Sequence, residues 1–353
     1  MRLFLSTEEA SVFSSWRESF AANAEILRLL AAYLNQCPRL VDPMLVAELT
    51  ASCNVGEKEA FLAILAAALD LDEERSEREA RLVRDYLPRA VFPVTPSFYV
   101  SDPYMQNVSV PCKVRNGWSL CREEYTPYEA FVCGGYSRFG EYCEVPSIGY
   151  FPNAFSFPAV KQNGVEWMAV KPNEIETMRA PLAAAQGDVL TYGLGLGYYA
   201  YMASARAEVR SVTVVERDAS VISLFREELL PQFPCRDKIT VIEADALEFA
   251  EREQIAGRYD TVFADLWHDT GDGLPLYLRL RRAEKEESDT RYTYWIEDQL
   301  LSALRAMVFA ELERAFEGKA DTADEKEIRG LDAVRETLSD RGLRDLAKHL
   351  RRA

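Results

Sequence analysis

The sequence has no long hydrophobic run. Hydrophobic residues make up 48% of its 353 residues, yet no segment approaches the roughly 18 apolar residues that a membrane-spanning helix needs. The first residues, MRLFLSTEEASVFSSW, carry acidic and polar side chains where a secretory signal would have an unbroken apolar region. We therefore expect a soluble cytoplasmic protein that does not associate with a membrane.

The sequence also lacks paired cysteines. Its 7 cysteines are an odd number, and no two of them form a C-x-x-C pair. This pattern fits neither a disulfide framework nor a zinc site, so we expect no bound metal. Histidine is scarce as well, with 2 residues, His268 and His349. His349 lies in a charged C-terminal segment, and we expect it on the surface.

The sequence has fewer basic than acidic residues. The chain has 57 Asp and Glu against 41 Lys and Arg, which gives a formal charge of −16. Nucleic acids need a basic surface, so we expect no nucleic-acid partner. An acidic surface would attract a cationic small molecule such as a polyamine, although solubility alone explains the charge equally well. A homo-oligomer is compatible with the sequence, which does not determine the oligomeric state.

The composition divides the chain into three predicted domains. Residues 1–92 repeat apolar positions at helical spacing, which predicts a helical domain. Four prolines in PRAVFPVTPSFYVSDP mark a boundary. Residues 93–168 are rich in aromatic and β-branched residues and predict a small β-rich element. Residues 169–353 form the third domain, which ends in a helical extension.

Two local motifs in the middle of the chain predict specific turns. Alternating apolar residues from Val108 to Val114 lead to Asn116-Gly117, a dipeptide typical of a type I′ hairpin turn. Further along, Asn173 followed by Glu176 predicts a capping box at the start of a short helix.

Strands and helices alternate after residue 187. We expect strands at 188–193, 211–216, 239–245 and 259–267, with helices at 198–207, 220–230 and 246–255. This order predicts an α/β fold with a doubly wound, Rossmann-like parallel sheet. A fifth strand is expected at RYTYWI, and an amphipathic helix begins at Ile296. The segments beyond it offer helices and no antiparallel strand pair.

The first predicted strand ends in a glycine-rich turn. Gly193, Gly195 and Gly197 alternate in YGLGLG, at the carboxyl edge where doubly wound sheets bind ligands. A dinucleotide-binding turn would need Gly or Ala at position 198, where this chain has Tyr198. The turn therefore disfavours NAD.

Two carboxylates follow the turn at the ends of the next strands. Glu216 ends the second strand, 19 residues after Gly197, where a carboxylate can accept hydrogen bonds from both ribose hydroxyls. Asp245 ends the third strand, where it can accept from an adenine amine while the amide of Ala246 addresses a ring nitrogen. Together they predict an adenosine site.

Through YGLGLG, VTVVERD, EADALEF and YDTVFADLW, roughly residues 165–275 resemble the class I S-adenosylmethionine-dependent methyltransferase superfamily. Within it the chain looks closest to the spermidine synthase-like branch, which also has a small β element before its Rossmann-like domain. The resemblance implies S-adenosylmethionine as cofactor. It would place the three glycines near the methionine part, Glu216 at the ribose, Asp245 and Ala246 at the adenine, and Tyr198 or Tyr199 near the sulfonium.

The fourth predicted strand ends in FADLWHDTGDG, which supplies the candidate catalytic residues Asp265, His268 and Asp269. An amine acceptor is protonated near neutral pH and needs a base, and histidine has a suitable pKa. We expect His268 to be that base, with Asp269 or Asp265 orienting it. Trp267 is a candidate for stacking on substrate.

The chain departs from the patterns of these families in several places. Tyr192 stands near the position of an acidic residue that many methyltransferases have before the first glycine. The spermidine synthase pattern reads Asp-Ser-Ser-Asp-Pro after the fourth strand, whereas this chain has His268 three residues beyond Asp265 and no proline after it. The Asn/Asp-Pro-Pro-Tyr motif of amide and adenine-amine methylases is also missing.

Three hypotheses follow. The first is methyl transfer from S-adenosylmethionine to a small or amine-bearing acceptor. The second is aminopropyl transfer from decarboxylated S-adenosylmethionine, and the third is a catalytically silent nucleoside-binding module.

Overall fold

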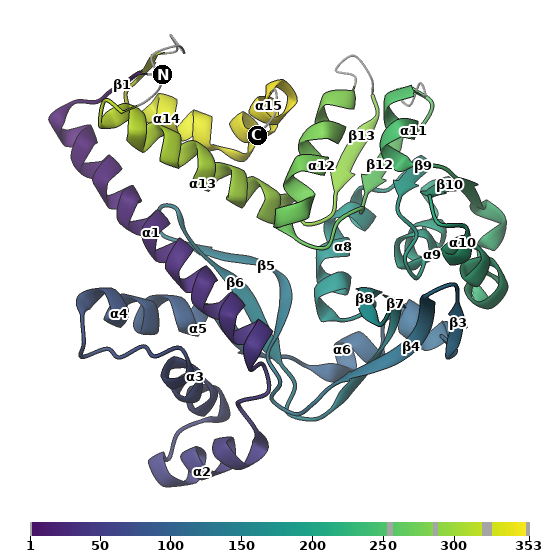
Figure 1. Cartoon of the computed structure of the whole chain (residues 1–353), viewed down its shortest axis with the longest axis horizontal. Helices are drawn as coiled ribbons and strands as arrows, with labels where there is room; N and C mark the ends of the chain where they lie inside the picture. The colour runs from purple at the N-terminus through teal and green to yellow at the C-terminus, as the bar shows by residue number, and fades with distance from the viewer. Residues whose placement is uncertain (1, 253–256, 285–288, 320–326, 351–353) are drawn as a thin grey trace.

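A five-stranded parallel sheet forms the centre of the C-terminal half of the chain (Figure 1). The computed structural model describes residues 2–252, 257–284, 289–319 and 327–350. The strand order β11-β10-β9-β12-β13 corresponds to 3-2-1-4-5 along the sheet, the order of the doubly wound Rossmann-like fold. The predicted fold class is confirmed. The strands are β9 (Gly187–Tyr192), β10 (Val209–Glu216), β11 (Ile239–Glu243), β12 (Thr261–Ala264) and β13 (Arg291–Tyr294).

Helices connect these strands and pack on the sheet. Helices α8 and α9 contact each other, and so do α11 and α12, as expected when helices cover both faces of a parallel sheet. The helix expected at 220–230 divides into α10 and a π-helical turn, η2, just before Pro231. Residues 253–255 of the expected helix 246–255 lie outside the described residues. The elements are α8 (Pro172–Ala184), α9 (Tyr198–Ser204), α10 (Ala219–Leu224), η2 (Phe225–Leu229), η3 (Leu230–Gln232), η4 (Arg236–Lys238), α11 (Ala246–Arg252) and α12 (Thr270–Ala283).

The N-terminal part is helical, as expected. Its longest helix, α1, begins with a capping box in which Ser6 and Glu9 bond each other's backbone N–H groups. A short strand, β1, precedes α1. The elements are β1 (Arg2–Phe4), α1 (Thr7–Gln36), α2 (Pro43–Cys53), α3 (Glu57–Ala68), α4 (Glu77–Arg81), the π-helical η1 (Leu82–Tyr86) and α5 (Leu87–Ala90).

The middle part contains two small sheets, β2-β6-β5 and β3-β4-β7-β8. The predicted hairpin turn is present, with positive φ at Asn116 and Gly117. Its first strand begins only at Lys113. Val108 and Val110 are buried, but they lie outside any strand. The elements are β2 (Val91–Pro93), α6 (Pro96–Val100), α7 (Pro103–Asn107), β3 (Lys113–Arg115), β4 (Trp118–Tyr125), β5 (Phe131–Phe139), β6 (Cys143–Tyr150), β7 (Phe155–Gln162) and β8 (Val165–Ala169).

Helix α8 starts earlier than the sequence motif predicts. Its N-cap is Lys171 and Pro172 is its first residue, a position that suits the fixed φ of proline. Asn173 therefore lies inside the helix, where its side chain accepts a hydrogen bond from the backbone N–H of Gly134 at 3.1 Å. The predicted capping box between Asn173 and Glu176 is wrong, since Glu176 accepts from the Tyr99 hydroxyl at 2.9 Å.

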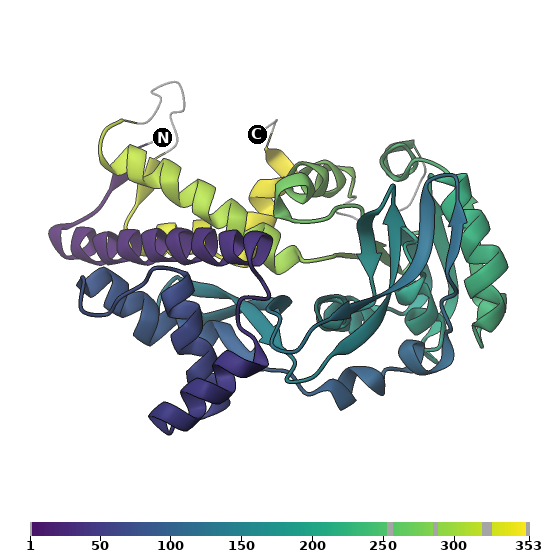
Figure 2. The same ribbon diagram turned by 60° about the horizontal axis from the view of Figure 1, so that its bottom comes forward.

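The C-terminal extension packs against the N-terminal helix (Figure 2). Phe20 of α1 stacks on Phe309 of α13 with 4.0 Å between the ring centroids. The described residues of the extension form helices and β14, a short strand that the sequence did not predict and that pairs in parallel with β1. His349 is exposed, as expected. The elements are α13 (Glu297–Phe316), β14 (Glu327–Arg329), α14 (Leu331–Leu338) and α15 (Asp340–His349).

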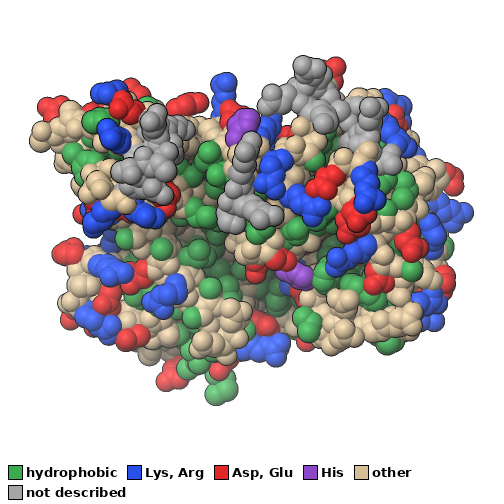
Figure 3. Space-filling view, turned by 45° about the horizontal axis from the view of Figure 1, so that its top comes forward, with side chains coloured by type: hydrophobic (Ala, Val, Ile, Leu, Met, Phe, Trp, Pro, Cys, Tyr) green, Lys and Arg blue, Asp and Glu red, His purple; other side chains and the backbone are tan. Residues whose placement is uncertain are grey.

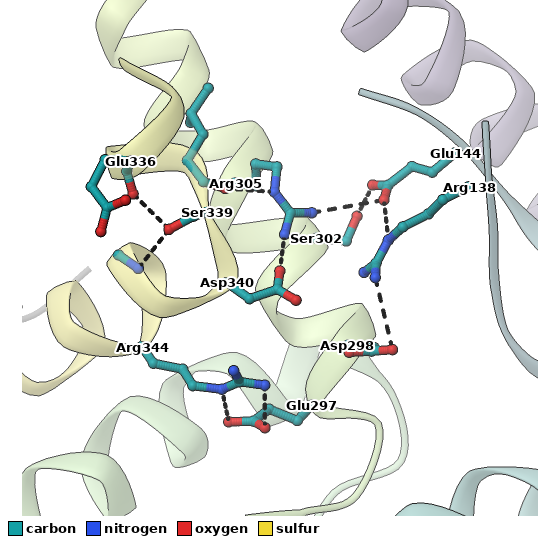
Figure 4. A network of polar contacts seen from close by, with 12 residues as sticks. Arg138, Glu144, Glu297, Asp298, Ser302, Arg305, Glu336, Ser339, Asp340 and Arg344 are labelled. Carbon is teal, nitrogen blue, oxygen red and sulfur yellow. Dashed lines mark hydrogen bonds and ion pairs between the residues drawn. The ribbon is translucent and has the colours of Figure 1, made fainter. Parts of the chain in front are cut away.

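A polar network ties this extension to the β5-β6 hairpin (Figure 4). The Arg305 side chain, 9% exposed, forms ion pairs with Asp340 and Glu144. Its Nε also donates to the carbonyl oxygen of Leu338 at 2.9 Å. Arg305 therefore connects α13, α15 and β6 through one guanidinium group.

The hydrophobic cores cross the predicted boundaries at residues 92 and 168. The largest core joins residues of the middle part to the parallel sheet. A second unites the N-terminal helices with β5 and β6, and a third joins α1 to α13 and α14. In the described residues no helix is long and apolar enough to cross a membrane.

Candidate functional site

A cavity of about 330 Å³ lies at the carboxyl edge of the parallel sheet. This edge is where doubly wound sheets bind ligands. Its walls come from the glycine turn, the ends of β10, β11 and β12, strand β8 and the start of α8. The lining side chains with charge or a ring nitrogen are Glu166, Trp167, Lys171, Glu174, Glu216, Arg217, Asp245, Asp265, Trp267, His268 and Trp295.

The glycine turn brings two of its three glycines to the cavity. Gly193 and Gly195 line it, whereas Gly197 is the N-cap of α9 and does not. A Cβ at Gly193, whose φ is +94°, would collide with the carbonyl oxygen of Asp265. At Gly197 it would meet the ring of Phe225. The turn therefore needs glycine at these two positions for close packing.

Glu216 is fixed at the cavity by backbone groups. Its Oε2 accepts from the N–H of Leu194 at 3.3 Å, and its Oε1 accepts from the N–H of Asp218 at 2.9 Å. Burial raises the pKa of Glu216, and these backbone hydrogen bonds oppose the rise. The carboxylate is thus held against the glycine turn.

Asp245 and Ala246 follow β11 at the same edge and line the cavity. Asp245 is exposed, and its Oδ1 caps α11 by accepting from the N–H groups of Leu247 at 2.9 Å and Glu248 at 3.0 Å. Ala246 is buried and is the first residue of α11. Asp245 therefore has a structural partner on one oxygen and faces the cavity edge.

The structure does not bring Tyr198 to the cavity. Its hydroxyl donates to Asp102 at 2.9 Å, and its ring packs edge-on against Tyr104. Tyr199 stacks on Phe263 of the sheet instead. The expected place of either tyrosine beside a sulfonium does not agree with these contacts, because both rings fill the core between α9 and its neighbours.

The loop after β12 brings two of the three candidate catalytic residues together. Asp265 and His268 line the cavity, while Asp269 is the N-cap of α12 and does not. His268 Nδ1 lies 3.0 Å from Oδ2 of Asp272, so the carboxylate that orients this ring is Asp272 rather than Asp265 or Asp269. The His268 ring also packs edge-on against Trp167, with 4.4 Å between centroids.

The sequence motifs missed one wall of the cavity. Glu166 and Trp167 lie on β8, and Lys171 and Glu174 lie at the start of α8. Lys171 Nζ is 2.5 Å from Oε1 of Glu166. The dipeptide Lys171-Pro172 could have indicated this wall. Proline favours the first position of a helix, and a helix that begins at Pro172 has Glu174 in its first turn.

The β3-β4 hairpin holds this wall against the parallel sheet. Trp118 Nε1 donates a hydrogen bond to the carboxylate of Asp218 at 2.9 Å. Asp218 lies two residues after Glu216. The Trp118 ring in turn contacts Trp167 edge-on at 5.6 Å. The middle part of the chain therefore closes the cavity opposite the glycine turn.

No family model matches the chain, and no curated protein does. Solved structures match parts of it: a spermidine synthase from Thermotoga maritima (16% identity, 43% of this chain, 56% of that one, TM-score 0.32), a probable spermidine synthase from Corynebacterium glutamicum ATCC 13032 (18%, 46%, 69%, 0.31) and a putative O-methyltransferase from Klebsiella pneumoniae (21%, 31%, 49%, 0.25).

The parallel sheet is Rossmann-like. With the strand order above, the resemblance drawn from the sequence motifs is confirmed as far as the fold goes. The matched part spans little more than half of the Thermotoga maritima spermidine synthase, at 56%.

Carboxylates dominate the cavity. Five of them line it against two permanent cations, Lys171 and Arg217, and Lys171 is already paired with Glu166. In the part of the chain that the structure describes, no group of three His, Cys, Asp or Glu is placed to hold a metal ion. On the face seen in Figure 3, acidic and basic side chains are interspersed around a hollow where hydrophobic side chains gather.

Proposed function

We propose that this cavity binds S-adenosylmethionine and that the protein transfers its methyl group to a small, amine-bearing acceptor. The observation that carries the proposal is the convergence of Gly193, Gly195, Glu216 and Asp245 on one cavity at the carboxyl edge of a Rossmann-like sheet. A sulfonium nucleoside and an ammonium acceptor are both cations, which suits the excess of carboxylates there.

The residues of the glycine turn and the strand ends would hold the cofactor. Gly195 offers backbone without a side chain beside Met168, whose sulfur a Cβ there would approach to 3.1 Å. Glu216 would accept from the ribose hydroxyls, and Asp245 with the N–H of Ala246 would address the adenine. The cofactor supplies an electrophilic methyl group on a positive sulfur.

The contribution of the protein to such a displacement is mainly orientation. Holding two reactants in line contributes up to roughly 7 to 11 kcal/mol in ideal cases. The wall formed by Glu166, Trp167 and Glu174 would hold the acceptor opposite the glycine turn. A protonated amine must lose a proton before it attacks, so a base beside it is required.

The test is a methyl-transfer assay with S-adenosylmethionine and a panel of primary and secondary amines, followed by formation of S-adenosylhomocysteine. Wild-type turnover that disappears in Asp265→Asn while donor binding is retained supports the proposal and excludes a silent nucleoside-binding module. Binding of the donor to Glu216→Ala and Asp245→Ala with wild-type affinity would contradict the assignment of the site.

A second candidate is aminopropyl transfer from the decarboxylated donor. Glu174 and Asp265 favour it, because both carboxyl groups line the cavity and would repel the donor's carboxylate. Incubation with decarboxylated S-adenosylmethionine and putrescine or spermidine tests it. Formation of a longer polyamine supports this candidate, and no product under conditions where methyl transfer proceeds rules it out.

A further inference from the structure

Glu174 is a buried carboxyl group without a hydrogen-bond partner for one of its oxygens. Its side chain lies in the first turn of α8, is 5% exposed and lines the cavity. Within the described residues, Oε1 has no partner. A buried carboxyl oxygen left in this way costs free energy unless it is protonated or meets a ligand.

Asp265 is the second carboxyl group at this position. It follows β12 and lines the same cavity, where its charge acts on Glu174. Burial raises the pKa of Asp265 to about 7. Burial, and then the charge of Asp265, raises the pKa of Glu174 well above its usual range.

The other charges around the pair do not neutralise it. Lys171 lowers the pKa of Glu174, but Glu166 raises it and also pairs with Lys171. The remaining titratable and charged groups on the cavity wall are Glu216, Arg217, Asp245 and His268. His268 already contacts Asp272 through Nδ1. The pair therefore behaves as two neighbouring carboxyl groups that cannot both be charged at low cost.

We propose that Glu174 and Asp265 form one carboxyl pair that shares a proton and accepts the proton of the amine acceptor. This inference rests on the proposed function, and it assigns to Glu174 a role that no sequence motif indicates. It also assigns the role of the base to this pair and not to His268.

The proposed step balances. An acceptor ammonium binds to the singly charged pair, an N–H bond breaks, and an O–H bond forms on the carboxylate. The freed nitrogen lone pair forms a bond to the methyl carbon as the C–S bond breaks, and the bonding electrons stay on sulfur. The pair ends neutral, the sulfonium becomes a thioether, and the methylated amine carries the positive charge.

The first test needs no donor and no acceptor. Infrared difference spectra of the wild-type protein are recorded from pH 5 to pH 9, and the carbonyl band of protonated carboxylic acid is followed. We expect a band that loses part of its intensity near pH 7, as the pair goes from two protons to one, and that is changed in both Glu174→Gln and Asp265→Asn. Glu243→Gln, an exposed position at the end of β11, is the control that leaves it unchanged. Absence of a wild-type band that titrates in this range overturns the shared proton.

The second test measures turnover against pH in Glu174→Gln and His268→Gln. We expect Glu174→Gln to lower kcat at least 100-fold with donor affinity changed less than twofold, and to lose the rise of kcat with pH. His268→Gln should keep that rise. If His268→Gln loses it and Glu174→Gln does not, the base is His268 and the inference is wrong.

The two tests separate the inference from the proposed function. If wild type shows the titrating band but neither binds nor turns over a sulfonium nucleoside, the carboxyl pair stands and the proposed function fails. If the wild-type protein transfers the methyl group and the band is missing, the proposed function stands and the carboxyl pair fails. Thermal unfolding of each variant, compared with Glu243→Gln, shows that loss of turnover is not loss of fold.

Discussion

The Glu216 carboxylate accepts a hydrogen bond from the backbone N–H of Leu194, the residue between the first two glycines of the turn, at 3.3 Å. The end of β10 and the turn after β9 therefore position each other. A ligand that bonds Glu216 also contacts a turn whose shape depends on Glu216, so binding and local order are coupled at this point.

Removal of the Glu216 charge tests this coupling. Glu216→Gln should weaken binding of S-adenosylmethionine by about 10- to 150-fold, because a hydrogen bond to a charged group contributes roughly 1.5 to 3 kcal/mol. Isothermal titration measures the change. Glu243→Gln, at the adjacent end of β11 and exposed, should bind like wild type. Equal affinities for the two variants would remove Glu216 from the site.

The glycine turn should not tolerate a side chain at its first position. Gly193→Ala places a Cβ against the Asp265 carbonyl at a φ of +94°. We expect a loss of roughly 1 to 3 kcal/mol or more in the free energy of unfolding, together with loss of donor binding. The matched control is Gly135→Ala in β5, where a Cβ meets no atom within 4 Å. Urea unfolding of both variants decides, and a Gly193→Ala protein as stable as the control contradicts the geometry.

Asp265 should make stability depend on pH. Its pKa is raised from 3.8 to about 7 by burial, so the folded state holds this proton more tightly than the unfolded state. The free energy of unfolding therefore falls as the pH rises from about 4 to 7. Above that range the loss of stability caused by the buried Asp265 charge is complete.

The substitution Asp265→Asn should remove the loss of stability that the buried Asp265 charge causes. Above pH 7 the variant should be more stable than wild type by up to about 4 kcal/mol, at 1.36 kcal/mol per pKa unit, and the two should converge near pH 4. Urea unfolding at pH 5 and pH 8 measures this, with Asp237→Asn as an exposed control. A variant that is less stable than wild type at pH 8 would show that the Asp265 charge is compensated.

The Arg305 network should matter for the C-terminal extension. Arg305→Met leaves Glu144 and Asp340 without this partner, and loss of one member of a buried ion pair costs about 3 to 5 kcal/mol. We expect the lower end of that range, because Asp340 is 38% exposed. Arg314→Met, an exposed pair with Glu311 on the same helix, should change stability by less than about 0.5 kcal/mol. Similar thermal unfolding of both variants would contradict the prediction.

The strand-end residues of the site could be predicted because they depend on local patterns. Glu216 ends strand β10, and Gly193, Asp245 and Asp265 follow the ends of β9, β11 and β12. Parallel strands bring their carboxyl ends to one edge. Tyr198 was misplaced because an aromatic residue after a glycine turn suits a ligand and a helix core equally well. Its hydroxyl position depends on Asp102, 96 residues away in the chain.

The opposite wall could not be predicted from such patterns. Glu174 lines the cavity because α8 starts at Pro172, which places Glu174 in the first turn of that helix. Asp272 replaces Asp269 as the partner of His268, since Asp269 caps α12 and turns away. Both outcomes depend on where a helix begins, to within one or two residues, and composition alone does not determine that.

Isothermal titration of the wild-type protein tests whether a sulfonium nucleoside binds at the carboxyl edge of the sheet. S-adenosylmethionine, its decarboxylated form, S-adenosylhomocysteine and NAD are titrated in parallel at one pH. We expect saturable binding of at least one of the two sulfonium donors and no binding of NAD, and the donor that binds more tightly identifies the group transferred. Binding of NAD, or of none of the four ligands, would contradict this expectation.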